Sequence, residues 1–511
     1  MSHLLSMERC LFAALFLLPV TAAISLSVPL LTDHALTWAT LREQIHETPT
    51  GQRLLAEAAE RAVGQGPPHT DALLRIFDAK DESDVRVTLF RDSAAWCPYC
   101  QKVWLFLEEK RIPYRVRKVS MNAYGDKPAW YTRKVDGGKL PAIELDGRMH
   151  VESFDIMKLL DAEFETQLKM LPLDGAKDAE LAEKLLYLEK ELQRDWFSLV
   201  FYPLKDEALE KARTNLLNTL LEVDQALSQT PGKWFLGGDN PSIIDIQYIV
   251  QMERLVVSAL YWKGLVIRGN FPNIDQWLEA FENQPNYIAT KSDYYTHVMV
   301  IPSQNGPGCS IPEAKDFANK ICGLDDAWKM PLDSHLEPLA PLQLLDGEEG
   351  ARHEAAFKLI SNAENIVHFC CRGAGEPGRP SFHAELADPY AEPNYDFKDA
   401  VDVCLRHVTT ALLHGIEKAE GNTQQDLAEK GGNNELRPDW YEYYNDDGKS
   451  YYWNEITGEV AYAPKTQQLD TCLMYLRDRV GVPRDMGNAA AMQLRAHLNW
   501  AIEIMESFET P

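Results

Sequence analysis

The chain is long, moderately hydrophobic and strongly acidic, and these properties exclude some classes of protein at once. It has 511 residues, of which 45% are hydrophobic, and a net charge of −26. That length predicts roughly three or four domains, and the hydrophobic fraction excludes a chain that is disordered throughout. The excess of acid argues against nucleic acid as a partner. The nine cysteines are dispersed, so the chain is not a disulfide scaffold.

Residues 1–24 have the pattern of a secretory signal. Arg9 precedes a short apolar run at residues 11–18, and small residues follow. In algae with complex plastids the same pattern opens a two-part plastid address, and residues 25–31, which contain no acid, would serve as its second part. We predict targeting to the plastid of an alga or to the secretory pathway, with a buried N-terminal helix as the alternative. No membrane span is expected after processing.

Residues 25–82 are predicted to be a helical N-terminal segment. Apolar residues recur on one side of a helix over residues 35–63, and a Gly- and Pro-rich stretch at residues 64–68 ends the pattern. We expect this segment to pack on the domain that follows.

Residues 83–163 alternate between strand and helix patterns. Strands are expected at residues 85–90, 114–119, 140–145 and 149–151, with helices after residue 97, at residues 128–135 and after residue 153. Asp146-Gly147 predicts a tight hairpin turn. Strand, helix and strand followed by a hairpin and a helix, with Cys-x-x-Cys after the first strand, predict a thioredoxin-like α/β fold.

Cys97 and Cys100 are the candidate redox residues. They lie where the first strand turns into the first turn of a helix, and free N–H groups at a helix N-terminus stabilise a thiolate. Cys97 is therefore the expected nucleophile, and Cys100 is placed to resolve a mixed disulfide on it. The alternatives are a structural disulfide and half of a zinc site. A zinc site needs a second pair of ligands, which the sequence lacks, so no metal is expected.

This block resembles the N-terminal domain of glutathione transferases with a cysteine active site. The resemblance is to the iota class above all, and more distantly to the omega class and the dehydroascorbate reductases. Residues 93–102 (SAAWCPYCQK) match the catalytic motif. The resemblance implies glutathione as a co-substrate, bound by five residues: Lys127, Leu140, Pro141, Glu152 and Ser153. It also implies a cis peptide bond before Pro141. Many omega-like enzymes lack the second cysteine, and its presence here would allow a dithiol cycle.

The same residues suit glutathione on chemical grounds. The tripeptide carries an amine and two carboxylates, so its pocket needs a cation, which Lys127 would supply. Glu152 and Ser153 would hold its amino-acid end, and the backbone before a cis-proline would offer free N–H and C=O groups. The alternatives are a surface lysine, a helix-capping serine and an ordinary turn proline.

Residues 165–297 are predicted to be all-α. Helical patterns cover residues 181–199, 208–227, 242–260 and 274–283, and Ser242 with Asp245 forms a capping-box signature. The features resemble the C-terminal domain of glutathione transferases. Tyr248, Tyr261 and Trp262 would line a second-substrate pocket, or else they are core aromatics.

Residues 298–511 are predicted to be a further helical extension. Residues 298–340 read as loop, and helices are expected at residues 355–369, 400–416, 469–480 and 489–505. Iota-class members resemble this chain in having such an extension. Arg484 and Arg495 lie near the last helix, where they would bind an anion or form ion pairs.

Residues 436–464 look like an insert in that extension and resemble a WW domain, a small three-stranded sheet. Trp440 and Pro464 would form its structural buckle, and Tyr452 and Tyr462 would form a groove for a Pro-rich peptide. The family usually has tryptophan where this chain has Tyr462.

These features predict a glutathione-dependent thiol transferase or reductase that acts by deglutathionylation or by dehydroascorbate-type reduction. Its partners would be glutathione and a small-molecule or protein disulfide acceptor, with a second copy of the chain in a homodimer as a further expectation. The alternative is a non-catalytic binding protein of the same fold, with the WW-like insert docking a partner.

Overall fold

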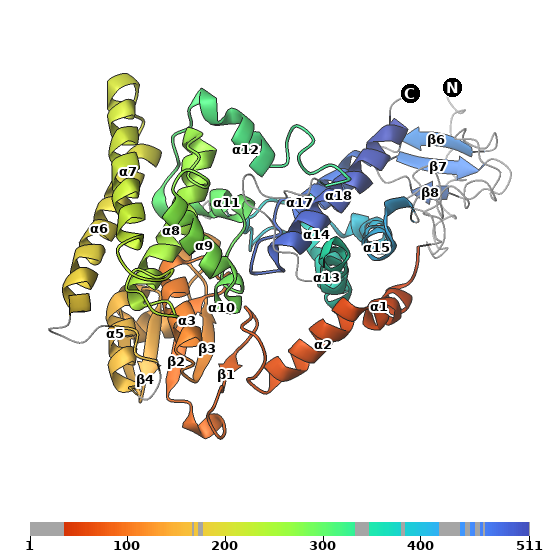
Figure 1. The fold of residues 1–511 in the computed structure, drawn as a ribbon. Coiled ribbons are helices and arrows are strands. Elements are labelled where there is room, and N and C mark those ends of the chain that lie inside the picture. The colour runs from red at the N-terminus through yellow and green to blue at the C-terminus, as the bar shows by residue number, and fades with distance from the viewer. Residues whose placement is uncertain are drawn as a thin grey trace, which may run out of the picture.

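The computed structural model has three connected parts: a sheet domain, a helical domain and a C-terminal helical extension (Figure 1). Residues 1–34 lie outside the described part of the chain, and the predicted signal lies with them. The residues that the structure describes are 35–165, 168–171, 177–332, 347–379, 384–417, 419, 440–444, 450–454, 460–462 and 466–509. None of the helices in these ranges combines the length and the apolar character needed to cross a bilayer.

The sheet domain has the predicted thioredoxin-like architecture. Its strands are β1 Leu74–Arg75, β2 Val87–Asp92, β3 Tyr114–Val119, β4 Ala142–Leu145 and β5 Arg148–Val151. The strand order is β1-β3-β2-β4-β5, with β2 parallel to β3 and antiparallel to β4. Asp146 and Gly147 have φ angles of 49° and 79°, which suits the predicted hairpin turn between β4 and β5.

Helices cover both faces of this sheet. The helices α3 Pro98–Glu109 and α5 Ser153–Glu163 contribute to the main core together with residues of the helical domain. The short helix α4 Ala129–Lys134 lies on the other face, where Tyr131 packs with Phe90 and Ala142. The strand β2, between these layers, therefore ends in a fully buried environment.

The N-terminal segment is helical as predicted, and its end packs on the sheet domain as expected, while its helices lie mainly against another part of the chain. It contains two helices, α1 Trp38–Glu47 and α2 Pro49–Ala62, because Thr48 ends the first helix and caps the second. These helices pack mainly on the C-terminal extension, where Leu41 and Ile45 join its core, and α2 also contacts β1. The strand β1 then adds to the sheet edge antiparallel to β3. Figure 1 shows α2 running from the sheet towards the extension.

The helical domain contains the four predicted helices and three more among its described residues. They are α6 Lys177–Val200, α7 Asp206–Leu227, α8 Ile243–Lys263, α9 Pro272–Glu282, α10 Pro285–Ile288, α11 Tyr294–Asn305 and α12 Lys315–Ile321. Ser242 and Asp245 form the predicted capping box at the start of α8. The expectation of loop over residues 298–340 was wrong for α11 and α12. The helix α11 tolerates Pro302 near its C-terminal end, where little of the helix remains to be interrupted.

The extension has its own buried core. Its helices are α13 Gly347–Ser361, α14 Ala363–Cys370, α15 Lys398–His414, α17 Thr466–Arg477 and α18 Asn488–Glu509. The single helix expected at residues 355–369 is two helices, which divide at Asn362 because that residue is not helical. Four thiols, those of Cys370, Cys371, Cys404 and Cys472, are buried in this core.

The extension is joined to the helical domain by polar contacts that are themselves buried. The guanidinium of Arg495 on α18 lies 2.5 Å from a carboxylate oxygen of Asp293, and both side chains are at most 2% exposed. Arg484 pairs with Asp485 at 2.7 Å. Of the two alternatives for Arg484 and Arg495, ion pairs are therefore confirmed.

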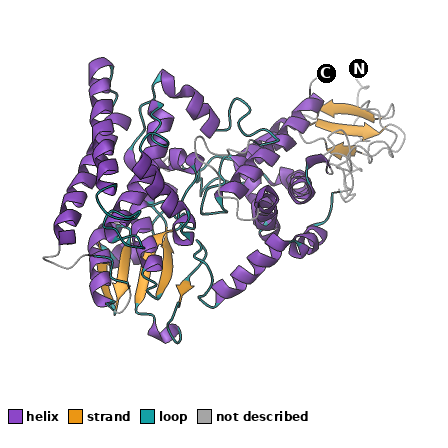
Figure 2. Cartoon of the chain, viewed as in Figure 1, coloured by secondary structure: helices purple, strands orange, loops and turns teal. Residues whose placement is uncertain are grey.

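Strands occur in two places in Figure 2, the sheet domain and a small sheet within the extension. The small sheet is antiparallel and is formed by β6 Trp440–Tyr444, β7 Ser450–Asn454 and β8 Val460–Tyr462. The predicted three-stranded insert is thus confirmed. Pro464, which would complete the buckle with Trp440, lies outside the described residues.

The register of this small sheet contradicts the predicted groove. Tyr462 is opposite Tyr451, and Tyr452 is opposite Ala461. Cross-strand partners share a face of a sheet, and successive residues of a strand alternate between faces. Tyr452 and Tyr462 therefore lie on opposite faces and cannot form one groove, whereas Tyr451 and Tyr462 share a face.

Candidate functional site

The two cysteines lie at the junction of β2 and α3, as predicted. Cys97 is the N-cap residue of α3, and Pro98 occupies the first turn, where its missing N–H costs no hydrogen bond. Cys97 is 6% exposed and Cys100 is 1% exposed, and both are free thiols. The helix N-terminus thus directs its partial positive charge at Cys97.

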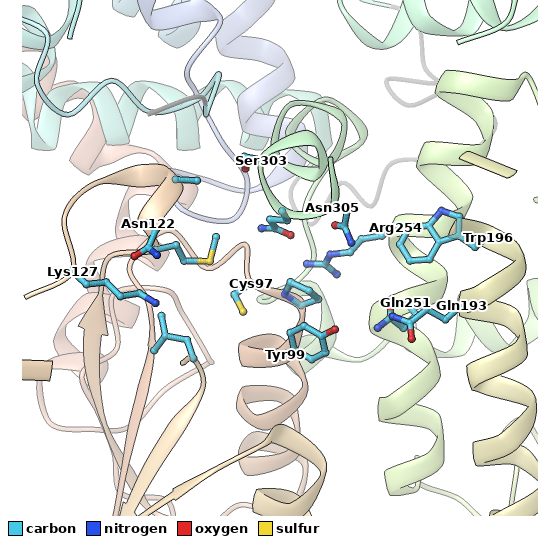
Figure 3. A pocket seen from close by; sticks show the side chains of 15 residues that line it. Cys97, Tyr99, Asn122, Lys127, Gln193, Trp196, Gln251, Arg254, Ser303 and Asn305 are labelled. Atoms are coloured by element: carbon cyan, nitrogen blue, oxygen red, sulfur yellow. The ribbon is translucent and has the colours of Figure 1, made fainter. Parts of the chain in front are cut away.

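Cys97 opens into a cavity of about 330 Å³ between the sheet domain and the helical domain. The size is at the lower end of the range for small-molecule sites. Figure 3 shows Lys127 and Arg254 on opposite sides of Cys97, with Trp196 and Gln251 further along the helical wall. The lining residues are Cys97, Pro98, Tyr99, Met121, Asn122, Ala123, Lys127, Leu140, Gln193, Trp196, Gln251, Arg254, Ser303, Gln304 and Asn305.

The charge of this cavity is opposite to that of the chain. Lys127 and Arg254 are cations, and none of the lining residues, all of which lie in the described part of the chain, is a carboxylate. The chain as a whole has a net charge of −26. Burial lowers the pKa of Lys127, while the neighbouring sulfurs of Cys97 and Cys100 act in the opposite direction. A ligand with carboxylates would meet attraction here and no like charge.

The structure brings three of the predicted glutathione-site residues together. Cys97, Lys127 and Leu140 all line the cavity, and the peptide bond between Leu140 and Pro141 is cis, as expected. The side-chain amine of Lys127 donates to the backbone oxygen of Gly138, 2.5 Å away.

Three other predicted residues are not among those that line the cavity: Pro141, Glu152 and Ser153. Glu152 is exposed at the end of β5 and pairs with Lys139 at 2.9 Å, and Ser153 begins α5. A ligand that reaches these two residues would have to extend beyond the enclosed part of the cavity and compete with Lys139 for Glu152.

Cys100 lies behind Cys97, away from solvent. Burial raises the pKa of Cys100 well above that of an ordinary thiol, and its hydrogen bond to Cys97 adds to this effect. The sulfurs of both cysteines and a carboxylate oxygen of Asp92 lie within 4.8 Å of one another. A closed structural zinc site takes four donors, and this group offers three. The same three atoms are close enough to exchange protons.

Arg254 is a site residue that the sequence analysis missed. Its guanidinium donates to the side chain of Gln101 at 2.9 Å and to the backbone oxygen of Trp96 at 3.1 Å. Gln304 on α11 donates to the same oxygen at 3.1 Å. Both residues therefore hold the backbone next to Cys97 in place. The sequence did contain a signal for Arg254. The helix α8 is buried on all sides and still contains the polar residues Gln251, Glu253 and Arg254, and polar residues in a buried helix point to a specific role.

The extension also contacts the backbone next to Cys97. The indole N–H of Trp96 donates to the backbone oxygen of Val482 at 3.1 Å, and the Arg484 guanidinium lies 4.6 Å from the centre of the Trp96 ring. Val482 in turn donates its N–H to Thr296 at 3.0 Å. The residue before Cys97 is thus packed against a segment almost four hundred positions later in the chain, which no local pattern predicts.

The three aromatic residues proposed for a second-substrate pocket are not among those that line the cavity. Tyr248 is fully buried, and its hydroxyl donates to the backbone oxygen of Leu185 at 2.6 Å. Trp262 is 5% exposed and packs in the main core with Tyr261. The alternative of core aromatics is therefore the one that the structure supports. Trp196 on α6 is the tryptophan that reaches the cavity.

A thioredoxin-like domain followed by an all-helical domain, with a cysteine at the cavity between them, is the arrangement of a two-domain glutathione transferase. Two family descriptions match the chain, "Glutathione S-transferase, N-terminal domain" at residues 96–163 and "Glutathione S-transferase, C-terminal domain" at residues 206–280. Together they cover the walls of the cavity except for α6 and α11.

Individual relatives agree with these matches. Glutathione S-transferase L3 of Arabidopsis thaliana is 32% identical over 200 residues, which is 39% of this chain and 79% of the relative. Protein IN2-1 homolog A of Oryza sativa subsp. japonica is 30% identical over 200 residues, 39% of this chain and 78% of the relative. The crystal structure of glutathione transferase Omega 3C from Trametes versicolor is 22% identical and covers 41% of this chain and 90% of that one, with a TM-score of 0.35. The chain belongs to the glutathione S-transferase family.

Proposed function

We propose that the protein is a glutathione-dependent thiol transferase with Cys97 as its nucleophile. The Cys97 sulfur attacks the glutathione sulfur of a glutathionylated thiol, forms a mixed disulfide with glutathione and releases the acceptor thiol. A second glutathione then attacks this mixed disulfide, leaves as oxidised glutathione and restores the Cys97 thiol. With cysteine in place of serine or tyrosine, the protein's own thiol reacts, so conjugation of glutathione to electrophiles should be weak.

The observation that carries this proposal is the charge of the cavity around a cysteine at a helix N-terminus. Glutathione has two carboxylates, and the cavity offers Lys127 and Arg254 with no lining carboxylate. Cys97 lies between these cations, so a bound glutathione would present its sulfur to the nucleophile. We assign Lys127 and Leu140 to glutathione binding within the cavity, and Glu152 and Ser153 to the part of the ligand that extends outside it.

The acceptor side of the cavity supports a polar second substrate. Gln193 and Gln251 come from α6 and α8, and Gln304 and Asn305 come from α11. Side-chain amides both donate and accept hydrogen bonds, so they suit a compound rich in hydroxyl and carbonyl groups, as in dehydroascorbate-type reduction, or the backbone of a glutathionylated protein. An aromatic electrophile would leave these amides buried without partners.

The test is turnover of a mixed disulfide between glutathione and 2-mercaptoethanol. We expect the parent protein to reduce it and the Cys97→Ser variant to lose at least about a hundredfold in rate, because no other described thiol opens into the cavity. Cys309→Ser is the matched control, since Cys309 is a half-buried thiol outside the cavity, and it should keep the parent rate. Full activity in Cys97→Ser would reject the proposal.

The rival proposal, a non-catalytic binding protein, predicts no turnover in either the parent or Cys97→Ser. It also predicts that both proteins bind glutathione equally, which calorimetry would show. One observation favours this rival proposal: the extension packs directly on Trp96, the residue before Cys97.

Other proposals concern class and partners. An iota-class-like assignment is supported by Cys100 and by the helical extension. Binding of a Pro-rich peptide by the insert would now use Tyr451 and Tyr462, which share a face of the small sheet. Targeting to an algal plastid or the secretory pathway, and formation of a homodimer, are further proposals. Imaging of a fluorescent fusion and light scattering would test them.

A further inference from the structure

Asp92 is a buried carboxylate that the proposed reaction has not used. It is the last residue of β2 and is fully buried. One carboxylate oxygen, Oδ2, accepts the backbone N–H of Trp96 at 2.7 Å. The other oxygen, Oδ1, is buried and has no hydrogen-bond partner among the described residues. A buried hydrogen-bond acceptor without a partner lowers the stability of the folded protein, so such a group is a candidate for a functional role.

The surroundings of the Asp92 carboxylate supply the explanation. A carboxylate oxygen of Asp92 and the sulfurs of Cys97 and Cys100 lie within 4.8 Å of one another, and Cys97 is the member of this group that lines the cavity. Cys100 is fully buried, so it retains its proton and donates it to Cys97. A protonated thiol is a poor nucleophile. Cys100 can therefore attack a mixed disulfide on Cys97 only if a neighbouring group takes its proton.

We propose that Asp92 is the proton acceptor for Cys100 when Cys100 resolves the mixed disulfide on Cys97. This inference rests on the proposed function and specifies its dithiol branch. Once Cys97 carries glutathione, its sulfur is part of a disulfide and cannot take the Cys100 proton, and Asp92 is the neighbouring base that remains.

The Cys100 proton passes to the Asp92 carboxylate, the Cys100 sulfur bonds to the Cys97 sulfur, and the bond from Cys97 to glutathione breaks. The electron pair of that bond leaves with glutathione, which is reduced to a thiolate and takes a proton from solvent or from Asp92. Cys97 and Cys100 end as a disulfide, which two further glutathione molecules reduce.

The groups around Asp92 are suited to this exchange. Its own neighbour Arg91 donates to the backbone oxygen of Asp92 at 2.8 Å, and no described lysine or arginine is paired with its carboxylate. A direct ion pair would have held the carboxylate charged and made it a weak base. The titratable groups that face Asp92 or the two sulfurs from the other packed elements are Tyr124, Lys127 and Tyr131, and the charged groups Arg254 and Arg484 contact the adjacent Trp96.

The test separates the two thiol steps with an aromatic disulfide, 5,5′-dithiobis(2-nitrobenzoic acid), which does not depend on glutathione recognition. The full-length reduced protein is mixed with one equivalent. Attack by Cys97 releases one nitrothiobenzoate and leaves a second one bound. Attack by Cys100 then releases the second. Absorbance gives both rate constants, and peptide masses distinguish the free dithiol, the adduct and the Cys97–Cys100 disulfide.

The variant Asp92→Asn keeps the shape of the side chain and an oxygen for the Trp96 N–H but cannot take the proton. We expect its second phase to be at least about tenfold slower at neutral pH and its first phase to be unchanged, because proton removal is needed only for Cys100. In a Cys100→Ser background, Asp92→Asn should change nothing. A slowed first phase in that background would mean that Asp92 only positions the cysteine segment, and an unchanged second phase would also overturn the proposal.

The pH dependence of the parent protein provides a second test that needs no variant to fold. With Asp92 as the acceptor, the second phase should vary little from about pH 6 to about pH 8, whereas loss of the proton to solvent hydroxide predicts about a tenfold rise per pH unit. That rise in the parent, or the absence of any second phase, would overturn the proposal. Failure of the proposed function would appear separately, as no turnover of the glutathione mixed disulfide.

Discussion

Removal of the Arg495 charge should destabilise the joint between the extension and the helical domain. Arg495 lies 2.5 Å from Asp293, donates to the backbone oxygen of Val480 at 2.7 Å and lies over the rings of Tyr295 and Trp328 at 4.5 and 5.2 Å. The Arg495→Met variant would keep most of the packing but leave Asp293 buried without its cation. Breaking one side of a buried pair costs about 3–5 kcal/mol, a large part of the stability of a typical domain.

A double-mutant cycle with Asp293→Asn provides the control, measured by urea unfolding. Asparagine can still cap α11 as Asp293 does through the Thr296 N–H. Each single variant leaves one charge buried, and the double variant leaves none, so the double variant should be more stable than either single variant. Equal and additive losses, or a cost below about 1 kcal/mol for Arg495→Met, would refute the reasoning. Turnover should fall as well, because α11 carries Gln304 to the cavity.

Three further predictions concern the second thiol, acid stability and the insert. The Cys100→Ser variant should accumulate glutathione on Cys97, visible by mass, and still turn over with excess glutathione; complete loss of turnover would mean that only the dithiol route operates. Burial, together with the charge of Arg352, lowers the pKa of His497 to about 4. The unfolded histidine titrates near 6.5, so as pH falls from about 6.5 to about 4 the unfolded chain takes up a proton that the folded chain refuses, and roughly 3 kcal/mol of stability is lost. His497→Leu should be free of that part of the loss in urea unfolding at a series of pH values, and an unchanged slope would contradict the assignment. Replacing residues 436–464 with a short Gly/Ser bridge should leave a folded protein with its thiol transferase activity, because α15 and α17 pack together without the insert. Unfolding of the whole chain by circular dichroism would show that the segment is integral to the extension.

The local parts of the site could be predicted because their signals are contiguous. Strand alternation, Cys-x-x-Cys and the following amphipathic helix lie within about twenty-five residues, so the thioredoxin-like turn with Cys97 at the N-cap of α3 follows from the sequence. The hairpin at Asp146-Gly147 and the capping box at Ser242 are equally local, and the structure has both.

Errors arose where one pattern fits two structures. A proline near the end of α11 resembles a loop signal, and the expected loop hid the helix that carries Gln304 and Asn305. In the insert, Tyr452 and Tyr462 were assigned to one groove. Tyr451 and Tyr452 are adjacent on β7 and therefore belong to opposite faces of the small sheet, so only one of them can share a face with Tyr462. Only the pairing of Tyr451 with Tyr462 decides which residue shares the face.

The sequence by itself determined most elements of this protein, the order of its domains and the placement of Cys97 at the start of α3, because hydrophobic period, turn residues and helix caps act over a few residues. Tertiary structure alone decided the composition of the cavity, in which Lys127 meets Arg254 from another domain. It also decided the hydrogen bond from Trp96 to Val482 and the position of Asp92 beside the sulfurs of Cys97 and Cys100. These relations depend on how separate elements pack, and packing is set by shape and burial across the whole chain rather than by any local pattern.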